Sequence, residues 1–324
     1  MHNYDSLSPE KIISAVESLG IRCNAILIPL NSYENRVYQV GIDNGEPIIA
    51  KFYRPGRWSS EQIIEEHEFS MELANADVSV VAPFKISDKT LFQFDTFRFS
   101  LFARRGGYPP ELEDLSNLKV LGRTLGRIHS IGQTRVFQYR PSISCLDEIR
   151  DSSIFLLGQF IPDELKSAYE SLISDIIKLC HNIFSDQLEI PSIRIHGDCH
   201  IGNILWRDDA AHFVDFDDCR NGPPIQDLWM FLSGLRADKE IQLNELIKSY
   251  REFCDFDPNQ IRLIEVLRTL RVINYAAWLA RRWDDPAFPK SFPWFNTMRY
   301  WSDHILELRE QLAAIQEEPL RLMV

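Results

Sequence analysis

The residues best suited to chemistry lie in one polar segment past the middle of the chain. The run His-Gly-Asp-Cys-His-Ile-Gly-Asn places Asp198 five residues before Asn203, and the next apolar run leads to Asp215 and Asp217. Transfer of a phosphoryl group from ATP needs positioning, charge neutralisation and a group that orients the acceptor hydroxyl. Mg²⁺ prefers oxygen ligands, so an amide oxygen and a carboxylate suit it. This spacing therefore predicts a phosphotransferase site that uses ATP and Mg²⁺.

The same segment also fits a transition-metal site of the kind found in hydrolases. His196, Asp198 and His200 alternate around Cys199, and all four are residue types that bind zinc. That interpretation leaves Asn203 and the second group of aspartates without a role, so we prefer phosphoryl transfer. His196 and His200 are then expected to be structural, bonding backbone groups near the loop.

The pattern H-G-D-x-H-x-x-N followed by V-D-F-D resembles the catalytic loop and metal motif of the aminoglycoside phosphotransferase and choline kinase group. The fold of that group is similar to that of protein kinases, whose H-R-D-x-x-x-x-N has the same Asp-to-Asn spacing. The resemblance implies that Asp198 is the catalytic base and that Asn203 and Asp215 bind the metal, so Asp215 also belongs to the catalytic set. Asp215 is preferred because the family's metal-binding Asp follows a strand hydrophobe, as Asp215 follows Val214. Asp217 stays open as an alternative ligand.

A lysine on a predicted strand supplies the group expected at the phosphates. Lys51 lies in the apolar run Ile-Ile-Ala-Lys-Phe-Tyr, where a lysine is unusual unless its ammonium faces a cleft. In kinases such a lysine is held by a Glu of the next helix. By its spacing to Leu73, Glu66 is the family-like choice for this nucleotide-binding role. The same helix also offers Glu61, Glu65 and Glu68.

The segment 31–36 occupies the place of the loop that covers the nucleotide phosphates. Its sequence, Asn-Ser-Tyr-Glu-Asn-Arg, contains no glycine, unlike the loop of protein kinases. Hydrogen bonds from Ser32 and from the asparagine side chains are expected in place of a glycine-rich backbone cradle. The resemblance implies that Ser32 contacts ATP.

A closer likeness spans almost the whole chain and includes the segments 29–40, 51–58, 196–207 and 280–294. Together these resemble the bacterial stress response kinase A family. The likeness implies a cytoplasmic serine/threonine protein kinase, with a protein Ser or Thr as acceptor and a role in survival under stress. Two alternatives stay open: a kinase of small hydroxyl compounds such as amino alcohols, sugars or aminoglycoside-like molecules, and a nucleotide-binding regulator without turnover.

The elements that must position these residues indicate an α+β, two-lobed protein-kinase-like fold. Residues 1–103 are predicted to form a β-rich nucleotide-binding lobe, and residues 104–324 a helical lobe that carries the catalytic loop and metal site. Strands are expected at 36–42, 47–53, 91–94 and 97–103, and helices at 8–19, 59–75, 115–130, 163–184, 225–235, 239–253, 258–283 and 297–317. The apolar runs 193–195 and 212–216 are expected to bracket a small hairpin that bears the chemistry.

Composition limits the partners. The 324 residues carry a formal net charge of -12, which argues against binding to nucleic acid through phosphate contacts. No apolar run approaches ~18 residues, so no membrane span is expected. The six cysteines are scattered without a C-x-x-C pair, which indicates reduced thiols in a cytoplasm. We expect a monomer.

Two further features are expected to be structural. In the resembling family an Asp at the position of Asp227 braces the catalytic loop. The aromatic segment 283–295 is expected to be a packed loop that closes the helical lobe.

Overall fold

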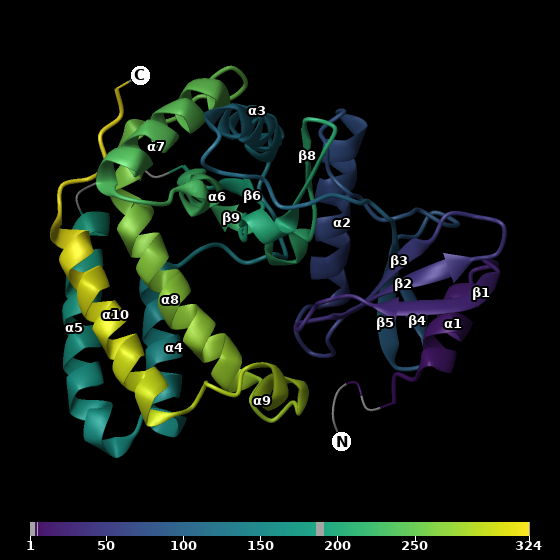
Figure 1. Cartoon of the computed structure of the whole chain (residues 1–324), viewed down its shortest axis with the longest axis horizontal. Helices are drawn as coiled ribbons and strands as arrows, with labels where there is room; N and C mark the ends of the chain where they lie inside the picture. Colours follow the sequence, from purple (N-terminus) through teal and green to yellow (C-terminus); the bar gives the residue numbers. More distant parts are fainter. Residues whose placement is uncertain (1–3, 5, 186–190, 324) are drawn as a thin grey trace.

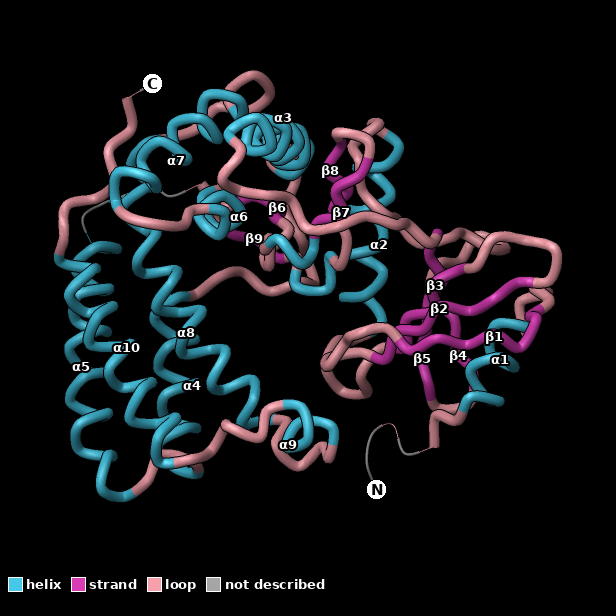
Figure 2. Tube along the Cα trace, in the orientation of Figure 1, coloured by secondary structure: helices cyan, strands magenta, loops and turns pink. Residues whose placement is uncertain are grey.

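A computed structural model describes residue 4 and residues 6–185 and 191–323 of the chain. A part built on a β-sheet and a larger helical part lie beside each other (Figure 1). The strands gather in the first part, with smaller pairs inside the second, as the tube in Figure 2 shows. The predicted protein-kinase-like fold is confirmed.

The sheet of the first part has five antiparallel strands in the order β1-β2-β3-β5-β4. Their bounds are Cys23–Pro29, Arg36–Ile42, Ile48–Phe52, Phe97–Ala103 and Phe92–Phe94 in that order. Because side chains alternate along a strand, Ala50 and Phe52 of β3 enter a small core beside α1 (Pro9–Glu17), whereas Lys51 points to the opposite face. Lys51 is registered between Val37 of β2 and Ser100 of β5, which fixes its position at the centre of the sheet.

Helix α2 (Ser60–Asn75) connects the two parts. It begins at a capping box in which Ser59 accepts from the backbone of Gln62 and the Gln62 side chain accepts from Ser59. Phe69 and Leu73 of this helix belong to the large core of the helical part. The predicted lobe boundary at residue 103 therefore stays a prediction, because α2 precedes this boundary but packs into the core of the helical part.

The helical part surrounds one large core. Its helices are α3 (Leu115–Gly132), α4 (Cys145–Gln159), α5 (Asp163–Ser185), α6 (Ile225–Leu228), α7 (Arg236–Tyr250), α8 (Ile264–Arg281), α9 (Ala287–Ser291) and α10 (Met298–Gln316). Helices α4, α5, α8 and α10 run side by side (Figure 1). Helices α3 and α7 approach closely, since a Cβ on Gly122 or Gly126 would lie 2.5 Å from a carbonyl oxygen of α7. This rigid framework carries the short strands that bear the polar segment.

Most predicted elements are confirmed within a few residues, and the errors have local causes. Strand β1 was not predicted; it is mostly exposed, and a bulge with Ala25 at φ 62° breaks its alternation. Helix α4 was not predicted either; among the described residues, the side chain of its cap Ser144 accepts no bond from the first turn, and two serines interrupt the apolar face of the helix. The predicted helices 225–235 and 258–283 are each partly 3-10 helix, at Trp229–Phe231 and Pro258–Leu263.

The predicted small hairpin is differently composed. Strand β6 (Ile193–Ile195) pairs with β9 (Arg220–Gly222) rather than with the run at 212–216. The hairpin itself is β7 (Ile204–Arg207) with β8 (Ala210–Phe213). The segment 196–203, predicted to be catalytic and called the catalytic segment below, therefore joins two separate strand pairs, which fix it from both sides.

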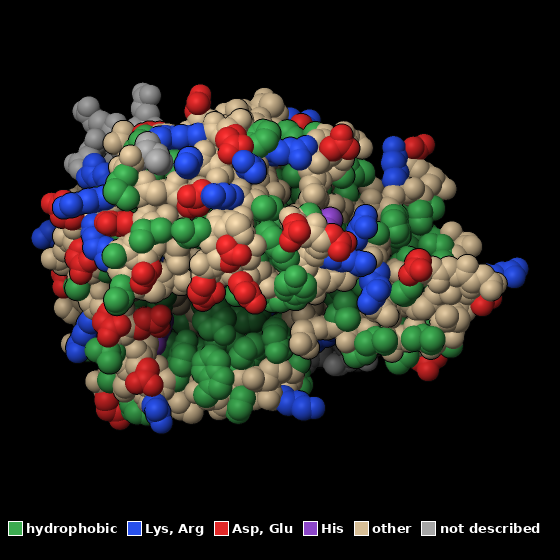
Figure 3. Space-filling model, turned by 45° about the horizontal axis from the view of Figure 1, so that its top comes forward, with side chains coloured by type: hydrophobic (Ala, Val, Ile, Leu, Met, Phe, Trp, Pro, Cys, Tyr) green, Lys and Arg blue, Asp and Glu red, His purple; other side chains and the backbone are tan. Residues whose placement is uncertain are grey.

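No helix among the described residues is long and apolar enough to cross a membrane. Acidic and basic side chains are interspersed over the face in Figure 3, and a hollow lined by hydrophobic side chains opens on the same face.

Candidate active site

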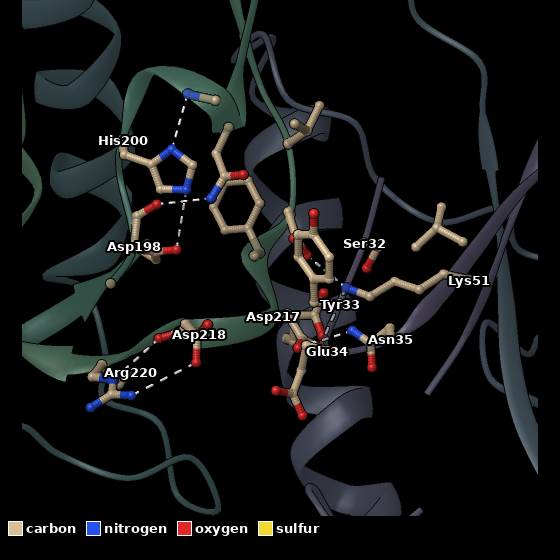
Figure 4. Close-up of a pocket in the computed structure, with 18 of the residues that line it drawn as sticks. Ser32, Tyr33, Glu34, Asn35, Lys51, Asp198, His200, Asp217, Asp218 and Arg220 are labelled. Carbon is tan, nitrogen blue, oxygen red and sulfur yellow. Dashed lines mark hydrogen bonds and ion pairs between the residues drawn. The ribbon is translucent and has the colours of Figure 1, made fainter. Parts of the chain in front are cut away.

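A cleft of about 820 Å³ lies between the sheet and the helical part. Loop 31–35, strand β3, the catalytic segment and helix α8 contribute to its lining. All seven residues predicted for the site line this cleft: Ser32, Lys51, Glu66, Asp198, Asn203, Asp215 and Asp217. Figure 4 shows Asp198 and His200 on one side of the cleft and Lys51 and Asn35 on the other.

Asp198 sits on the loop that follows β6. One carboxylate oxygen accepts a hydrogen bond from Nη1 of Arg271, and the other lies 3.4 Å from Nε2 of His200. Burial favours the neutral acid, but the hydrogen bond from His200 and the charge of Arg271 outweigh it and hold the pKa of Asp198 below its usual range. The carboxylate is therefore ionised at neutral pH and can accept a hydrogen bond from a hydroxyl.

Asp227 of α6 braces this loop from below. Its carboxylate accepts from the backbone N–H groups of His196 (2.7 Å) and Gly197 (2.8 Å) and contacts Nε2 of His129 at 3.0 Å. The other ring nitrogen of His129 lies 3.0 Å from the hydroxyl of Tyr250. The predicted bracing role of Asp227 is confirmed, and it extends into the α3–α7 packing.

The transition-metal interpretation is wrong for the part of the chain that the structure describes. No group of three or more His, Cys, Asp or Glu side chains is placed there to hold a metal ion. The ring of His196 lies 2.9 Å from the carbonyl oxygen of Val214 through Nε2, and Nδ1 of His200 accepts from the N–H of Gly202 at 3.0 Å. Both histidines bond backbone groups of the site, as predicted.

Asn203 and Asp215 are held next to each other through the backbone. The N–H of Val214 donates to the carbonyl oxygen of Asn203 at 3.0 Å, so Asn203 is bonded to the residue just before Asp215. The amide nitrogen of Asn203 donates to the backbone oxygen of Asp198 at 2.9 Å, and its side-chain oxygen accepts no hydrogen bond from the residues that the structure describes. Asp215 adopts φ 59° and its side chain is 50% exposed. The side-chain oxygen of Asn203 and the half-exposed carboxylate of Asp215, one oxygen of which accepts from Lys51, are oxygen ligands of the kind that a hard cation prefers.

Lys51 reaches these carboxylates from the sheet. Its Nζ lies 2.8 Å from Asp215 and 3.3 Å from Asp217, and the residue is only 6% exposed. Burial lowers the pKa of Lys51, but the two carboxylates more than offset burial and hold that pKa well above its ordinary value. The ammonium is therefore a fixed positive charge inside the cleft.

Glu66 lies in the same cleft as Lys51, and its charge adds to the rise of the Lys51 pKa, so its predicted role toward Lys51 stays a prediction. Among the described residues, the ion pairs of Lys51 are those with Asp215 and Asp217. Burial raises the pKa of Glu66 to about 7 even against the attraction of Lys51. A carboxyl with a raised pKa attracts the ammonium less than Asp217 does, because, against the effect of burial, the neighbouring cations hold the pKa of Asp217 below its usual range.

Asp217 differs from Asp215 in its surroundings. It is 2% exposed and accepts hydrogen bonds from Nη1 of Arg57 and, at 3.1 Å, from the amide of Asn35. The second guanidinium nitrogen of Arg57 donates to Asp218 at 2.6 Å. With Lys51 also nearby, the carboxylate of Asp217 is already neutralised by cations.

The loop without glycine is fixed by side chains from the opposite part of the molecule. Glu34 accepts from Nε1 of Trp278 and from Nη2 of Arg282, each at 2.7 Å, and lies 3.2 Å from Nε of Arg54. Arg54 also donates to Asp285 at 3.2 Å. We call these five residues the cross-lobe cluster. Packing of the segment 283–295 is confirmed by its ring contacts, such as Trp283 with Phe295.

Sequence reasoning missed several residues that complete the site. Arg57, Arg271, Arg282 and His129 contact the predicted groups, yet none was assigned a role. Arg57 and Arg282 lie inside segments that carry the family likeness, which is the signal that could have found them. Arg271 and His129 gave no such signal, because only tertiary packing brings them to the loop.

Comparisons with known proteins agree with this geometry. Residues 26–264 match the model of a family described as phosphotransferase enzymes. The chain is 43% identical to stress response kinase A of Escherichia coli K12 over 321 residues, covering 98% of this chain and 97% of that protein. It is 41% identical to the serine/threonine protein kinase RdoA of Salmonella typhimurium, with the same coverage.

Solved structures share the fold at low identity. An amicoumacin kinase matches with a TM-score of 0.73 at 18% identity, over 98% of this chain and 95% of that one. A microcompartment-associated aminopropanol kinase matches with a TM-score of 0.70 at 17% identity, over 94% and 96%. At these identities the likeness concerns the fold alone.

Proposed function

Since the chain belongs to the phosphotransferase enzyme family and is a homologue of stress response kinase A, we propose that it transfers the γ-phosphate of ATP to serine or threonine hydroxyls of proteins. That it is an ATP-dependent phosphotransferase follows from the family. The observation that carries the proposal is the meeting of Lys51, Asp198, Asn203 and Asp215 in one cleft. A role in the response to stress is part of the proposal, by its relatives' name.

The nucleotide fits between the sheet and the β7–β8 hairpin. Val37 and Ile49 line the cleft on the face of the sheet that carries Lys51, and Leu205 and Val214 line it from the hairpin side. These apolar side chains suit the flat adenine ring. The triphosphate then extends toward Lys51, whose fixed charge suits its anionic oxygens. Ser32 of the covering loop lies in the same cleft and is proposed to contact ATP.

The site also fits a Mg²⁺ ion, with Asn203 and Asp215 as its protein ligands. The side-chain oxygen of Asn203 and the half-exposed carboxylate of Asp215 are the hard donors that this ion prefers. Asp217 is the poorer candidate, because it is buried and Arg57 and Asn35 both bond one of its two carboxylate oxygens. A bound Mg²⁺ would neutralise part of the triphosphate charge.

Asp198 is proposed to orient the acceptor. Its carboxylate accepts the hydrogen bond of the incoming hydroxyl and so directs the oxygen toward the γ-phosphorus. As the new P–O bond forms and the bond to the β-phosphate oxygen breaks, the hydroxyl proton passes to Asp198 and ADP leaves. The low pKa of Asp198 suits orientation more than early proton removal.

A small amine as acceptor is the second candidate, since one protein of the same fold is an aminopropanol kinase. A cationic acceptor needs a carboxylate that is not already paired. Glu148 also lines the cleft, but it lies 3.4 Å from Arg220 and accepts from Asn274 at 3.1 Å. This pairing favours a protein hydroxyl over a small cation.

Incubation of the purified protein with labelled ATP, Mg²⁺ and generic protein acceptors tests the proposal. Transfer should be lost in Asp198→Ala and Asp215→Asn, and in the wild type on chelation of Mg²⁺. The exposed Asp303→Ala on α10 is the matched control and should keep full activity. Saturable ADP release with small metabolites but none with proteins would support the second candidate. Protection by ATP against unfolding without any transfer would indicate a regulator.

We place the protein in the cytoplasm, where ATP is abundant. The six cysteines are unpaired, which agrees with a reducing compartment.

A further inference from the structure

The acceptor side of the cleft, which we define as the part lined by Asp198 and helix α8, presents a guanidinium directly at the proposed catalytic base. Arg271 projects from α8 and donates to a carboxylate oxygen of Asp198, although the two residues are 73 positions apart. The side chain of Arg271 is 41% exposed. A hydroxyl that binds Asp198 must therefore arrive beside Arg271.

Three other charged residues that line the cleft, Glu148, Arg220 and Asp218, are paired with one another. Glu148 pairs with Arg220 and Asn274, and Arg220 also lies 3.9 Å from Asp218. Figure 4 shows Arg220 and Asp218 next to each other, apart from Asp198. Arg271 is different, because its carboxylate partner is the residue that must accept the substrate hydroxyl.

Guanidinium has five N–H donors arranged in a planar fork, and its contact with Asp198 runs through Nη1. The donors on its other edge point away from this contact and can bind a second carboxylate. We propose that Arg271 recognises an acidic residue next to the serine or threonine that receives the phosphate. This inference rests on the proposed protein-kinase function and names the class of acceptor for it.

The geometry limits where the acidic residue lies. A carboxylate on the far edge of the guanidinium lies on the order of 5–7 Å from a hydroxyl held by Asp198, by the usual hydrogen-bond lengths. An extended peptide advances about 3.3–3.6 Å per residue. The acidic residue is therefore one or two positions from the phosphorylated residue.

A set of peptides with a central serine tests the inference. Their flanking positions carry Asp, Gln or Lys in otherwise identical sequences, and kcat/KM is measured for each. The wild type should prefer the Asp peptides over the Lys peptides by about 10-fold or more, as expected for a charge-assisted hydrogen bond. Arg271→Gln should reduce this ratio to near 1, and Arg271→Lys should keep part of it.

The ratio between peptides is the decisive quantity, because any general effect of Arg271 on Asp198 or on folding cancels in it. Arg299→Gln is the matched control, since the Arg299 side chain is 91% exposed on α10, and its ratio should equal that of the wild type. A wild-type ratio near 1, or a ratio unchanged in Arg271→Gln, overturns the inference but leaves the protein-kinase function intact. Transfer to none of the peptides or protein acceptors, with ADP release on small hydroxyl compounds, overturns both.

Discussion

The contribution of Asp227 to the stability of the protein can be predicted from its three contacts at the loop of Asp198. The residue is fully buried, and its carboxylate faces the N–H groups of His196 and Gly197 and the ring of His129. Asp227→Ala removes all three interactions and leaves buried donors without acceptors. Each such donor costs about 1–3 kcal/mol. Because contacts in one network are not additive, we expect a total loss of about 3–5 kcal/mol.

Asp227→Asn is the sharper test. One carboxylate oxygen serves Gly197 alone, and the other serves both His196 and His129. An Asn at this position can orient its side-chain oxygen toward His196 and His129, which keeps both of these contacts. Its amide nitrogen then faces the N–H of Gly197, which loses its acceptor. The expected loss of unfolding free energy is then about 2 kcal/mol, which is the cost of one buried donor without an acceptor. The same change displaces Gly197, the neighbour of Asp198, so kcat should fall while the KM for ATP changes little.

Thermal unfolding and steady-state kinetics measure both effects. At about 2.1 cal/mol/K per residue, a chain of 324 residues that unfolds as one unit loses about 1.5 °C of Tm per kcal/mol. Asp227→Ala should therefore lower Tm by about 5–8 °C and Asp227→Asn by about 3 °C. Asp303→Asn, an exposed site on α10, is the control and should change neither quantity. If Asp227→Asn keeps the wild-type Tm and kcat, the bracing argument is wrong.

Three further predictions concern the cleft. Lys51→Met should raise the KM for ATP by roughly 10-fold, because a buried charge-assisted contact is lost; an ATP titration measures this, and an unchanged KM would remove Lys51 from the nucleotide site. In the cross-lobe cluster, Glu34→Gln and Arg282→Gln should each raise the KM for ATP, and the double variant should be little worse than either; additive effects would mean that the pair does not position the loop together. Burial raises the pKa of Glu66 from an ordinary 4.5 to about 7, so the stability it contributes is present below pH 4.5 and is lost as pH rises through 7. Urea unfolding of Glu66→Gln should lack this loss, and identical pH profiles for variant and wild type would contradict the shift.

Local spacing was a good guide to the secondary structure. Strand β2 and helix α10 agree with their predicted ranges within two residues, because alternation and helical periodicity are properties of neighbouring side chains. Strand β1 and helix α4 escaped prediction for the opposite reason. An exposed, bulged edge strand and a helix without a side-chain cap carry weak local patterns, and tertiary packing stabilises them instead.

The pairing of the short strands shows the same limit. The apolar runs at 193–195 and 212–216 were recognisable, but β6 pairs with β9 and β8 pairs with β7. Runs of three or four residues can pair in several ways, so the choice depends on which partners the surrounding helices bring together.

The sequence by itself identified the residues that we propose as reacting groups. Asp198, Asn203 and Asp215 lie close along the chain, so a strand, a tight loop and a hairpin suffice to bring them together. Tertiary structure alone decided which charges face them. Lys51 meets Asp215 across 164 positions, and Arg271 meets Asp198 across 73. Such contacts depend on how the sheet and α8 pack around the cleft, and no local spacing encodes that packing.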